Sequence, residues 1–297
     1  MSTQPGTRND ALAAQSNAGR NELPTIALRL YDAHNHLQDE RLRLDDVMWK
    51  ELAAENVQKM VVNGACEGDW DTVLDLARNH PQIIPSFGYH PWYVRERSAR
   101  WREVLIRYLD AGVAAVGEIG LDRWIKDYDL GLQEEMFFAQ MSMAAERNLP
   151  VSIHCQQAWG RLLELLEDGP RPKCGFVLHS FGGPQEMIEP LARHGAYFSL
   201  PGYFAHGRKD RQREAFRHVP PDRLLIETDA PDQPLPPERV RYPLPPSTEG
   251  KPLNHPANLG AVYQFAAELL GEALGTLAPR VEKNFLRLFG QLCERQR

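Results

Sequence analysis

The chain has 297 residues, of which 42% are hydrophobic and 25% are charged, a balance typical of globular proteins. This length admits one large α/β barrel or two ordinary domains. A formal net charge of -6 excludes nucleic-acid binding driven by the field of the whole molecule, so any contact with a polyanion must be local.

The amino-terminal segment, residues 1–23, is rich in small and polar residues and predicts a flexible tail. It lacks the apolar core of a secretory signal, and no run in the chain approaches the length of a membrane helix. We therefore expect a cytoplasmic protein without a membrane segment, in which residues 24–297 form a single domain.

Eight short apolar runs, each bounded by Gly, Pro or polar residues, alternate with longer amphipathic segments. The runs cover residues 28–34, 59–64, 83–88, 114–120, 151–155, 176–179, 196–200 and 224–228. This alternation is typical of βα units around a parallel sheet. Eight such units predict an α/β fold of the (β/α)₈ TIM barrel type.

The segments between the runs carry apolar residues at helical spacing. Helices are predicted over 44–56, 70–79, 101–109, 133–148, 159–167, 185–193, 259–270 and 282–292. The stretch 231–256 is different, because nine of its 26 residues are Pro. It predicts a long loop after the eighth strand, which either forms a lid or wall for a substrate or is a passive surface excursion.

Chemically competent side chains gather at the predicted strand ends, where barrels of this type place their reacting groups. His34 and His36 follow the first run at a spacing that directs both side chains to one side. An H-x-H pair alone predicts little more than a buried polar contact. Four further groups of the same chemistry end other runs: Glu118, His154, His179 and Asp229. Four imidazoles and two carboxylates in one mouth favour a metal centre, and six ligands suggest two ions.

Five motifs in chain order resemble the signatures of the TatD family of metal-dependent hydrolases, over roughly Tyr31 to Phe289. They are Asp32-Ala33-His34-Asn35-His36-Leu37, Gly117-Glu118-Ile119-Gly120-Leu121-Asp122, Pro150-Val151-Ser152-Ile153-His154, Leu178-His179-Ser180-Phe181-Gly182-Gly183 and Ile226-Glu227-Thr228-Asp229-Ala230-Pro231. Gly88-Tyr89-His90-Pro91 and the ending Asn284-Phe285-Leu286-Arg287-Leu288-Phe289 are similar to two further family markers.

The resemblance implies a barrel of the amidohydrolase superfamily that uses two divalent ions (Zn, Mg or Mn) and, in many members, acts as a DNase. It assigns His34, His36 and Asp229 to the first ion, Glu118 to a bridging position, and His154 and His179 to the second ion. Two such ions can generate a bridging hydroxide that attacks a phosphodiester. The resemblance thus marks Glu118 and Asp229 as catalytic.

Three individual roles follow from the motifs and from general chemistry. Asp229 either orients and deprotonates the attacking water or is a ligand only. His90 is expected near the substrate rather than on the ions. Asp32 is expected to accept a hydrogen bond from a ligand imidazole and so to orient it.

The sequence departs from the family pattern at two places. His154-Cys155-Gln156 stands where many relatives have His-x-Arg, and Leu253-Asn254-His255-Pro256 stands where they have Arg-Asn-Glu-Pro. The missing arginine removes a bidentate clamp for a phosphate, which weakens the inference of a nucleic-acid substrate.

Several other side chains are candidate contacts for nucleic acid. Arg208 and Arg211 belong to a basic run after the seventh strand that either meets a DNA backbone or is a solvated surface. Trp92, Tyr93 and Trp124 follow the third and fourth strands and either stack on bases or pack over the barrel rim.

Three functions are therefore compared. The leading hypothesis is a monomeric DNase that cleaves phosphodiester bonds at accessible single-stranded ends. The second is an amidohydrolase-like enzyme that cleaves a C–N or ester bond in a small molecule. The third is a noncatalytic interaction barrel, which is disfavoured because all six ligand positions carry competent residues.

Overall fold

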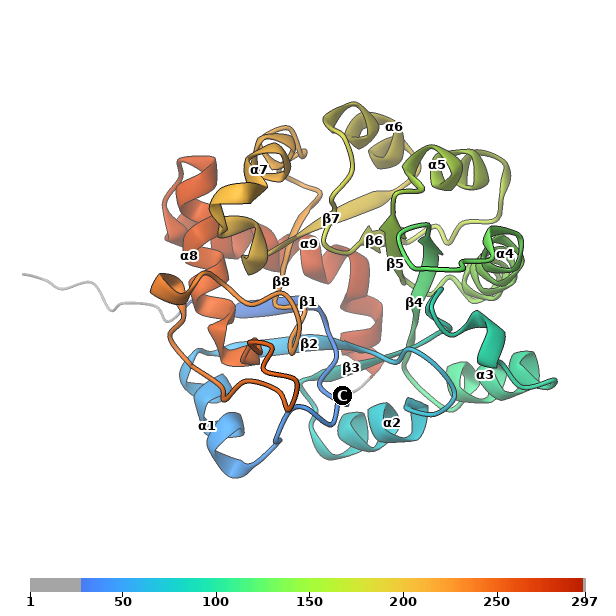
Figure 1. The fold of residues 1–297 in the computed structure, drawn as a ribbon, viewed down its shortest axis with the longest axis horizontal. Coiled ribbons are helices and arrows are strands. Elements are labelled where there is room, and N and C mark those ends of the chain that lie inside the picture. The colour runs from blue at the N-terminus through green and yellow to red at the C-terminus, as the bar shows by residue number, and fades with distance from the viewer. Residues whose placement is uncertain (1–27, 296–297) are drawn as a thin grey trace, which may run out of the picture.

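The computed structural model describes residues 28–295, and the tail predicted for residues 1–23 lies outside them. Eight parallel strands form one sheet in which each strand pairs with the next along the chain (Figure 1). They are β1 (Leu30–Asn35), β2 (Val57–Asn63), β3 (Ile83–Phe87), β4 (Ala115–Asp122), β5 (Val151–Gln156), β6 (Phe176–Leu178), β7 (Ala196–Pro201) and β8 (Leu224–Glu227). The predicted (β/α)₈ barrel is confirmed, and each of the eight apolar runs contains its strand or overlaps it.

Helices surround the strands on the outside of the barrel (Figure 1). They are α1 (Asp46–Ala54), α2 (Trp70–Asn79), α3 (Trp101–Asp110), α4 (Leu130–Arg147), α5 (Trp159–Asp168), α6 (Ile188–Arg193), α7 (Asp210–Phe216), α8 (Leu259–Leu270) and α9 (Leu274–Arg295). Within residues 28–295, none of these helices combines the length and the apolar character that a bilayer crossing requires.

Two helices differ from the prediction. α7 was not among the predicted helices, because most of its seven residues are charged or polar and only Ala215 and Phe216 are buried. α9 begins at Leu274, well before residue 282, and contains Pro279. The helix packs against β1 and β8, and its buried residues include Leu277 and Phe285.

The seam between β1 and β8 is joined through one buried carboxylate. Asp32 accepts hydrogen bonds from the Thr228 backbone N–H (3.0 Å) and the Thr228 hydroxyl (2.5 Å). Beside it, the Asp229 N–H donates to the His34 carbonyl (3.0 Å), and the His36 N–H donates to the Ala230 carbonyl (2.7 Å). These bonds fix the end of β8 against the end of β1, so the residues that follow the two strands meet.

The Pro-rich stretch after β8 is anchored rather than loose. Buried Asn254 donates its side-chain N–H to the Thr228 carbonyl (2.7 Å), and its backbone N–H donates to the Pro231 carbonyl (2.8 Å). Further along, the Asn258 side chain accepts the backbone N–H groups of Arg241 and Tyr242, both at 2.9 Å. The segment is therefore held at both ends beside the mouth of the barrel.

Gly120 of β4 lies directly against the backbone of His154 in β5. Its φ of 152° lies outside the range that side chains favour, and a Cβ at this position would run into the carbonyl oxygen of His154. The close approach brings Glu118 on β4 and His154 on β5 to the same end of the barrel.

We expect Gly120→Ala to destabilise the fold by about 2 kcal/mol or more, because the obstructing atom is backbone and cannot move away. Chemical denaturation followed by circular dichroism measures the change. The matched control is Gly160→Ala, which has open space around its Cβ position within α5 and should stay within about 1 kcal/mol of wild type. Equal stabilities for the two variants would contradict the close-approach argument.

Candidate metal centre

The structure brings six predicted ligand residues together at the carboxyl ends of the strands. His34 lies in β1 and His36 directly beyond it, while His179 follows β6 and Asp229 follows β8. Glu118 and His154 are not at the very ends of their strands, because β4 extends to Asp122 and β5 to Gln156. Three overlapping groups of these side chains, one of which includes His90, have ligand atoms within 4.8 Å of one another.

The first cluster consists of His34, His36, Asp229 and one oxygen of Glu118. The Nε2 atoms of His34 and His36 are 3.2 Å apart and lie 3.3 and 3.2 Å from Glu118 Oε2. Asp229 Oδ1 lies 3.7 Å from both imidazole nitrogens. A tetrahedral ion with ligands at about 2.1 Å has ligand atoms about 3.4 Å apart. The first cluster fits such an ion.

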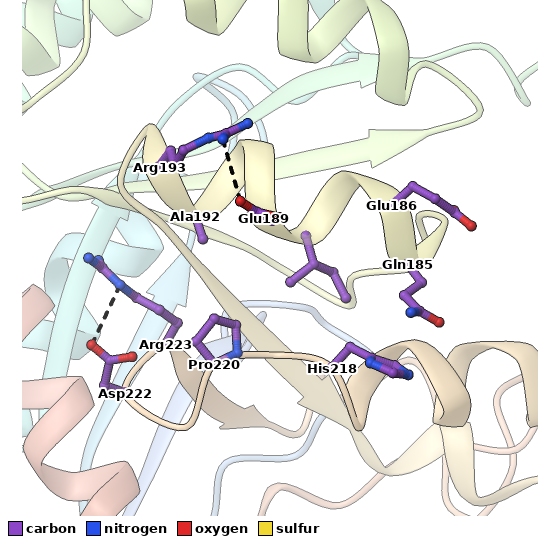
Figure 2. A pocket seen from close by; sticks show the side chains of 10 residues that line it. Gln185, Glu186, Glu189, Ala192, Arg193, His218, Pro220, Asp222 and Arg223 are labelled. Carbon is purple, nitrogen blue, oxygen red and sulfur yellow. Dashed lines mark hydrogen bonds and ion pairs between the residues drawn. The ribbon is translucent and has the colours of Figure 1, made fainter.

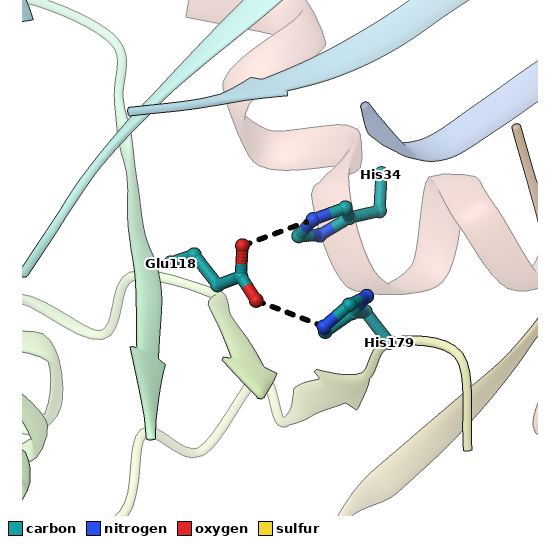
Figure 3. A group of neighbouring side chains, drawn as sticks. All are labelled: His34, Glu118 and His179. Carbon is teal, nitrogen blue, oxygen red and sulfur yellow. Dashed lines mark ion pairs between the residues drawn. The ribbon is translucent and has the colours of Figure 1, made fainter. Parts of the chain in front are cut away.

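The second cluster consists of His154, His179 and the other oxygen of Glu118. Glu118 Oε1 lies 3.1 Å from His154 Nδ1 and 2.8 Å from His179 Nε2, and those nitrogens are 3.1 Å apart. Figure 3 shows the Glu118 carboxylate with one oxygen toward His34 and the other toward His179. One carboxylate thus belongs to both clusters.

Three imidazoles are oriented by hydrogen bonds from the nitrogen that faces away from Glu118. His34 Nδ1 lies 2.7 Å from the Ser152 hydroxyl, and His36 Nδ1 lies 2.8 Å from the Asn63 carbonyl. In β5, His154 Nε2 lies 3.0 Å from Asp122 Oδ2. A proton on His36 Nδ1 and on His154 Nε2 leaves the lone pair of the other nitrogen directed into its cluster, as metal-binding histidines require. His34 Nδ1 also faces the side-chain N–H of Asn63 (3.1 Å), so its two contacts do not fix its tautomer.

His90 differs from the other histidines in its tautomer. Its Nδ1 accepts the backbone N–H of Trp92 (3.2 Å), so in the neutral ring the proton is on Nε2, 3.4 Å from Glu118 Oε1. Burial lowers the pKa of His90 to about 4, which keeps the ring neutral. His90 therefore presents an N–H donor to the centre, although its distances alone would admit it as a ligand.

The electrostatics of the centre call for cations. Burial opposes ionisation of Glu118, but the imidazoles of His179, His90 and His34 outweigh it and hold its pKa well below the usual range. Its Oε1 is buried and accepts no hydrogen bond from the described residues. An ionised, buried carboxylate oxygen among imidazole nitrogens is a ligand set suited to divalent metals. The residues present therefore fit a bound metal.

The same carboxylates act on the histidines. Burial opposes the charged form of His36, but the hydrogen bond and charge of Glu118 outweigh it and raise the pKa to about 10. In His154 burial is again outweighed, here by Asp122 and Glu118, and the pKa rises to about 9. Burial raises the pKa of Asp229 to about 7. Without a metal, protons occupy positions that an ion would take.

Sequence reasoning missed three residues that support the centre, and two of them lie on the Asp229 side. Gln233 donates its side-chain N–H groups to Asp229 Oδ2 and to the Ser180 hydroxyl oxygen, both at 2.6 Å. Ser180 in turn donates its backbone N–H (2.7 Å) and its hydroxyl (2.5 Å) to buried Glu227. Glu227 was visible in the motif around Asp229, but nothing in the sequence indicates that Gln233 turns back toward that carboxylate.

Asp122 is the third such residue. Its Oδ2 faces His154 and also accepts the indole N–H of Trp92 (2.7 Å), while its Oδ1 accepts the backbone N–H of Trp124 (2.7 Å). Burial opposes ionisation, but the His154 and Trp92 hydrogen bonds outweigh it and lower the pKa of Asp122 to about 2. The carboxylate that orients a ligand imidazole is therefore Asp122.

Asp32 does not have the partner that the sequence suggested. Its donors are Thr228, the Asn35 side chain and the backbone N–H of His34, and no imidazole nitrogen is among them in the described structure. The side chain lies below the ligands and closes the seam between β1 and β8. It acts on the backbone of His34 rather than on its ring.

The two predicted basic contacts lie on the surface. Arg208 donates to the Tyr203 hydroxyl, and its guanidinium carbon is 5.1 Å from the centre of that ring. Arg211 is exposed in the first turn of α7. Arg208 thus contacts Tyr203, five residues before it in the chain, and does not contact a residue of either cluster.

The molecule also carries a hollow of about 600 Å³ beside α6 (Figure 2). Two ion pairs lie within its wall, since Arg193 lies 3.4 Å from Glu189, and Arg223 lies 3.9 Å from Asp222. No residue of the two clusters lines it.

Known proteins with similar sequences are DNases and metal-dependent hydrolases. A family model described as TatD related DNase matches residues 31–290. The 3'-5' ssDNA/RNA exonuclease TatD of Escherichia fergusonii is 33% identical over 251 residues, which are 83% of this chain and 92% of that protein. The metal-dependent hydrolase YcfH of Escherichia coli K12, itself described as uncharacterized, is 32% identical over 88% of this chain and 95% of its own length.

A solved structure agrees with these sequence relatives. The crystal structure of YJJV, a TatD homologue from Escherichia coli K12, matches with a TM-score of 0.77 and 26% identity, over 89% of this chain and 99% of that one. The family model spans almost the whole described barrel, including both clusters. The chain belongs to the family of TatD-related DNases.

Proposed function

We propose that the protein is a two-metal phosphodiesterase that hydrolyses single-stranded DNA. The observation that carries the proposal is the Glu118 carboxylate, whose Oε2 is within 3.3 Å of the imidazoles of the first cluster and whose Oε1 is within 3.1 Å of those of the second. A carboxylate shared in this way suits a pair of divalent ions. Zn, Mg and Mn are the candidates, since imidazole and carboxylate ligands accept each of them.

When bound, such ions supply the positive charge that lowers the pKa of an attacking water and neutralises the oxygens of a phosphodiester. The residues of the chain have separate tasks around that charge. His34, His36 and Asp229 hold the first position, His154 and His179 hold the second, and Glu118 belongs to both.

Asp229 is the proposed proton acceptor. Its Oδ1 faces the first cluster, and its Oδ2 is held by the Gln233 side chain at 2.6 Å. A carboxylate fixed at both oxygens can orient a water and take its proton without losing its position. His90, with its proton on Nε2, is proposed to donate a hydrogen bond to a phosphate oxygen of the substrate.

Single-stranded nucleic acid is the proposed substrate class, and the Escherichia fergusonii relative is itself named an ssDNA/RNA exonuclease. Arg208 and Arg211 are exposed and are proposed to meet the backbone of the strand away from the clusters. Gln156 is exposed at the end of β5 and supplies no charge for a phosphate clamp. Because Gln156 carries no charge, cleavage of an amide or ester bond in a small molecule remains the alternative function.

The cytoplasmic location and the monomeric state of the enzyme remain predictions.

Asp229→Asn should reduce cleavage of single-stranded DNA by about 10² to 10⁴-fold, because the amide cannot accept the proton. A metal-supplemented panel of single-stranded DNA, RNA, a phosphate monoester and small amides measures the rates. Asp232→Asn is the matched control, since it makes the same change at an exposed carboxylate three positions along and should retain activity. Activity on amides alone would favour the alternative, and no activity on any substrate with full metal loading would favour an interaction barrel.

Metal binding at pH 7 should release between two and three protons per chain, on the order of one per protonated ligand, because the pKa values of His36 (about 10) and His154 (about 9) leave both rings protonated and that of Asp229 (about 7) leaves its carboxyl group half protonated before an ion binds. Titration calorimetry in buffers of different ionisation enthalpy gives the proton count, which should fall as the pH rises past 9. Elemental analysis should find two ions in wild type, one in His154→Ala and two in the control His218→Ala. One ion in wild type would contradict the two-metal proposal.

Gln233→Leu should lower kcat about tenfold or more while KM and the melting temperature change little, because Asp229 loses a charge-assisted hydrogen bond that fixes its orientation. Gln264→Leu removes a similar glutamine-to-carboxylate bond on α8, far along the chain, and should leave kcat unchanged. An unaffected kcat in Gln233→Leu would remove Gln233 from the positioning of Asp229.

A further inference from the structure

Two indole rings border Asp122, the carboxylate that orients His154. Trp92, in the loop after β3, is 48% exposed, and Trp124, in the loop after β4, is 65% exposed. A single exposed apolar side chain is common on protein surfaces and needs no explanation. Two exposed tryptophans beside a candidate metal centre are a different case, because both donate hydrogen bonds to Asp122, the carboxylate that orients His154.

Trp92 makes three contacts with Asp122 and His90, which border the second cluster. Its indole N–H donates to Asp122 Oδ2 (2.7 Å), and that oxygen lies 3.0 Å from His154 Nε2. Its backbone N–H donates to His90 Nδ1 (3.2 Å). The ring centre is 5.1 Å from that of His90, at an interplanar angle of 89°. A flat group resting on the exposed part of this indole would thus lie next to the cluster.

Trp124 is attached to the same carboxylate through its backbone. Its N–H donates to Asp122 Oδ1 (2.7 Å), as does the N–H of Ile125 (3.1 Å). Within residues 28–295, no aromatic ring or cation is found stacked on the Trp124 indole, in contrast to Tyr128 nearby, which has Arg123 over its ring at 5.9 Å. The hydrogen bond to Asp122 fixes the backbone of Trp124, and the indole ring remains exposed to solvent.

The loop also carries exposed charges of both signs. Arg123 and Lys126 lie on either side of Trp124, and the carboxylates Asp127 and Asp129 follow them, so the aromatic faces rather than the net charge distinguish this loop. Proteins that bind single strands combine aromatic faces, on which bases stack, with cations that follow the backbone. A duplex buries the faces of its bases within its own stack, so an aromatic surface of this kind distinguishes unpaired bases from paired ones.

We propose that Trp92 and Trp124 form a base-stacking subsite that receives the unpaired bases next to the phosphodiester to be cleaved. The inference rests on the proposed nuclease function and extends it by naming the side chains that select single strands. Asp122 connects the subsite to the chemistry, because the same carboxylate holds the Trp92 indole, the Trp124 backbone and the His154 imidazole.

Trp124 gives the cleaner test, because substitution keeps the backbone N–H that donates to Asp122. Steady-state kinetics would compare a short oligothymidylate with a strand of equal length that has abasic sites next to the scissile bonds. We expect Trp124→Ala to raise KM for oligothymidylate about fivefold or more and Trp124→Phe to raise it less, since each stacked base contributes substantially to binding. Both variants should leave the KM for the abasic strand and kcat unchanged.

Phe138→Ala is the matched control, because it removes another exposed aromatic ring (52% exposed), on the outer surface of α4, and should change neither KM. A second variant, Trp92→Leu, removes a stacking face together with the bond to Asp122 and should raise KM for oligothymidylate while also lowering kcat.

The outcomes separate the two proposals. If wild type cleaves both strands and Trp124→Ala has the wild-type KM for each, the stacking subsite is overturned while the nuclease function stands. Equal loss of affinity for the normal and the abasic strand would also overturn stacking, since it would point to a general rim contact. If metal-loaded wild type cleaves neither strand, the nuclease function is overturned and the subsite falls with it.

Discussion

The structure of the centre depends on one buried, ionised carboxylate placed among histidines. Glu118 is 2% exposed, and its two oxygens face different pairs of imidazoles. Burying such a charge is costly unless opposite charge lies close to it, and neutral imidazole carries no net charge. Protons on His36 and His154 balance the charge when no ion is bound. Divalent cations would balance the Glu118 charge better. The burial that makes this charge costly in free energy therefore also suits the carboxylate to binding a metal.

The surrounding hydrogen bonds convert a cluster of side chains into an oriented centre. Ser152, the Asn63 carbonyl and Asp122 each face the outer nitrogen of one histidine, which directs the inner nitrogen toward Glu118. The Trp92 backbone N–H has the opposite effect on His90, because it donates to the outer nitrogen, Nδ1, and so leaves the proton on Nε2, which faces the centre. Histidines of the same residue type thus take ligand or donor roles according to what contacts their second nitrogen.

The barrel seam links this orientation to folding. Asp32 joins β1 to Thr228 after β8, and the neighbouring backbone bonds place Asp229 opposite His34. Asp229 has a φ of 55°, in the left-handed region that few residues other than glycine adopt. Its position is supported from the other side by Gln233, whose own segment is anchored through Asn254. The first cluster is therefore held by contacts on both sides of the seam.

The sequence by itself determined the eight strands, the barrel and six of the side chains that gather at one end of it, because strand periodicity is local and the carboxyl ends of parallel strands must meet at one face. The resemblance to the family also predicted a bridging position for Glu118. Only the tertiary structure decided which nitrogen of each histidine faces the centre, that Asp122 rather than Asp32 orients a ligand ring, and that Gln233 returns to Asp229. Those outcomes depend on hydrogen bonds between residues that are distant along the chain or separated by turns, and a residue's spacing does not specify which partner its side chain will find once the barrel has closed.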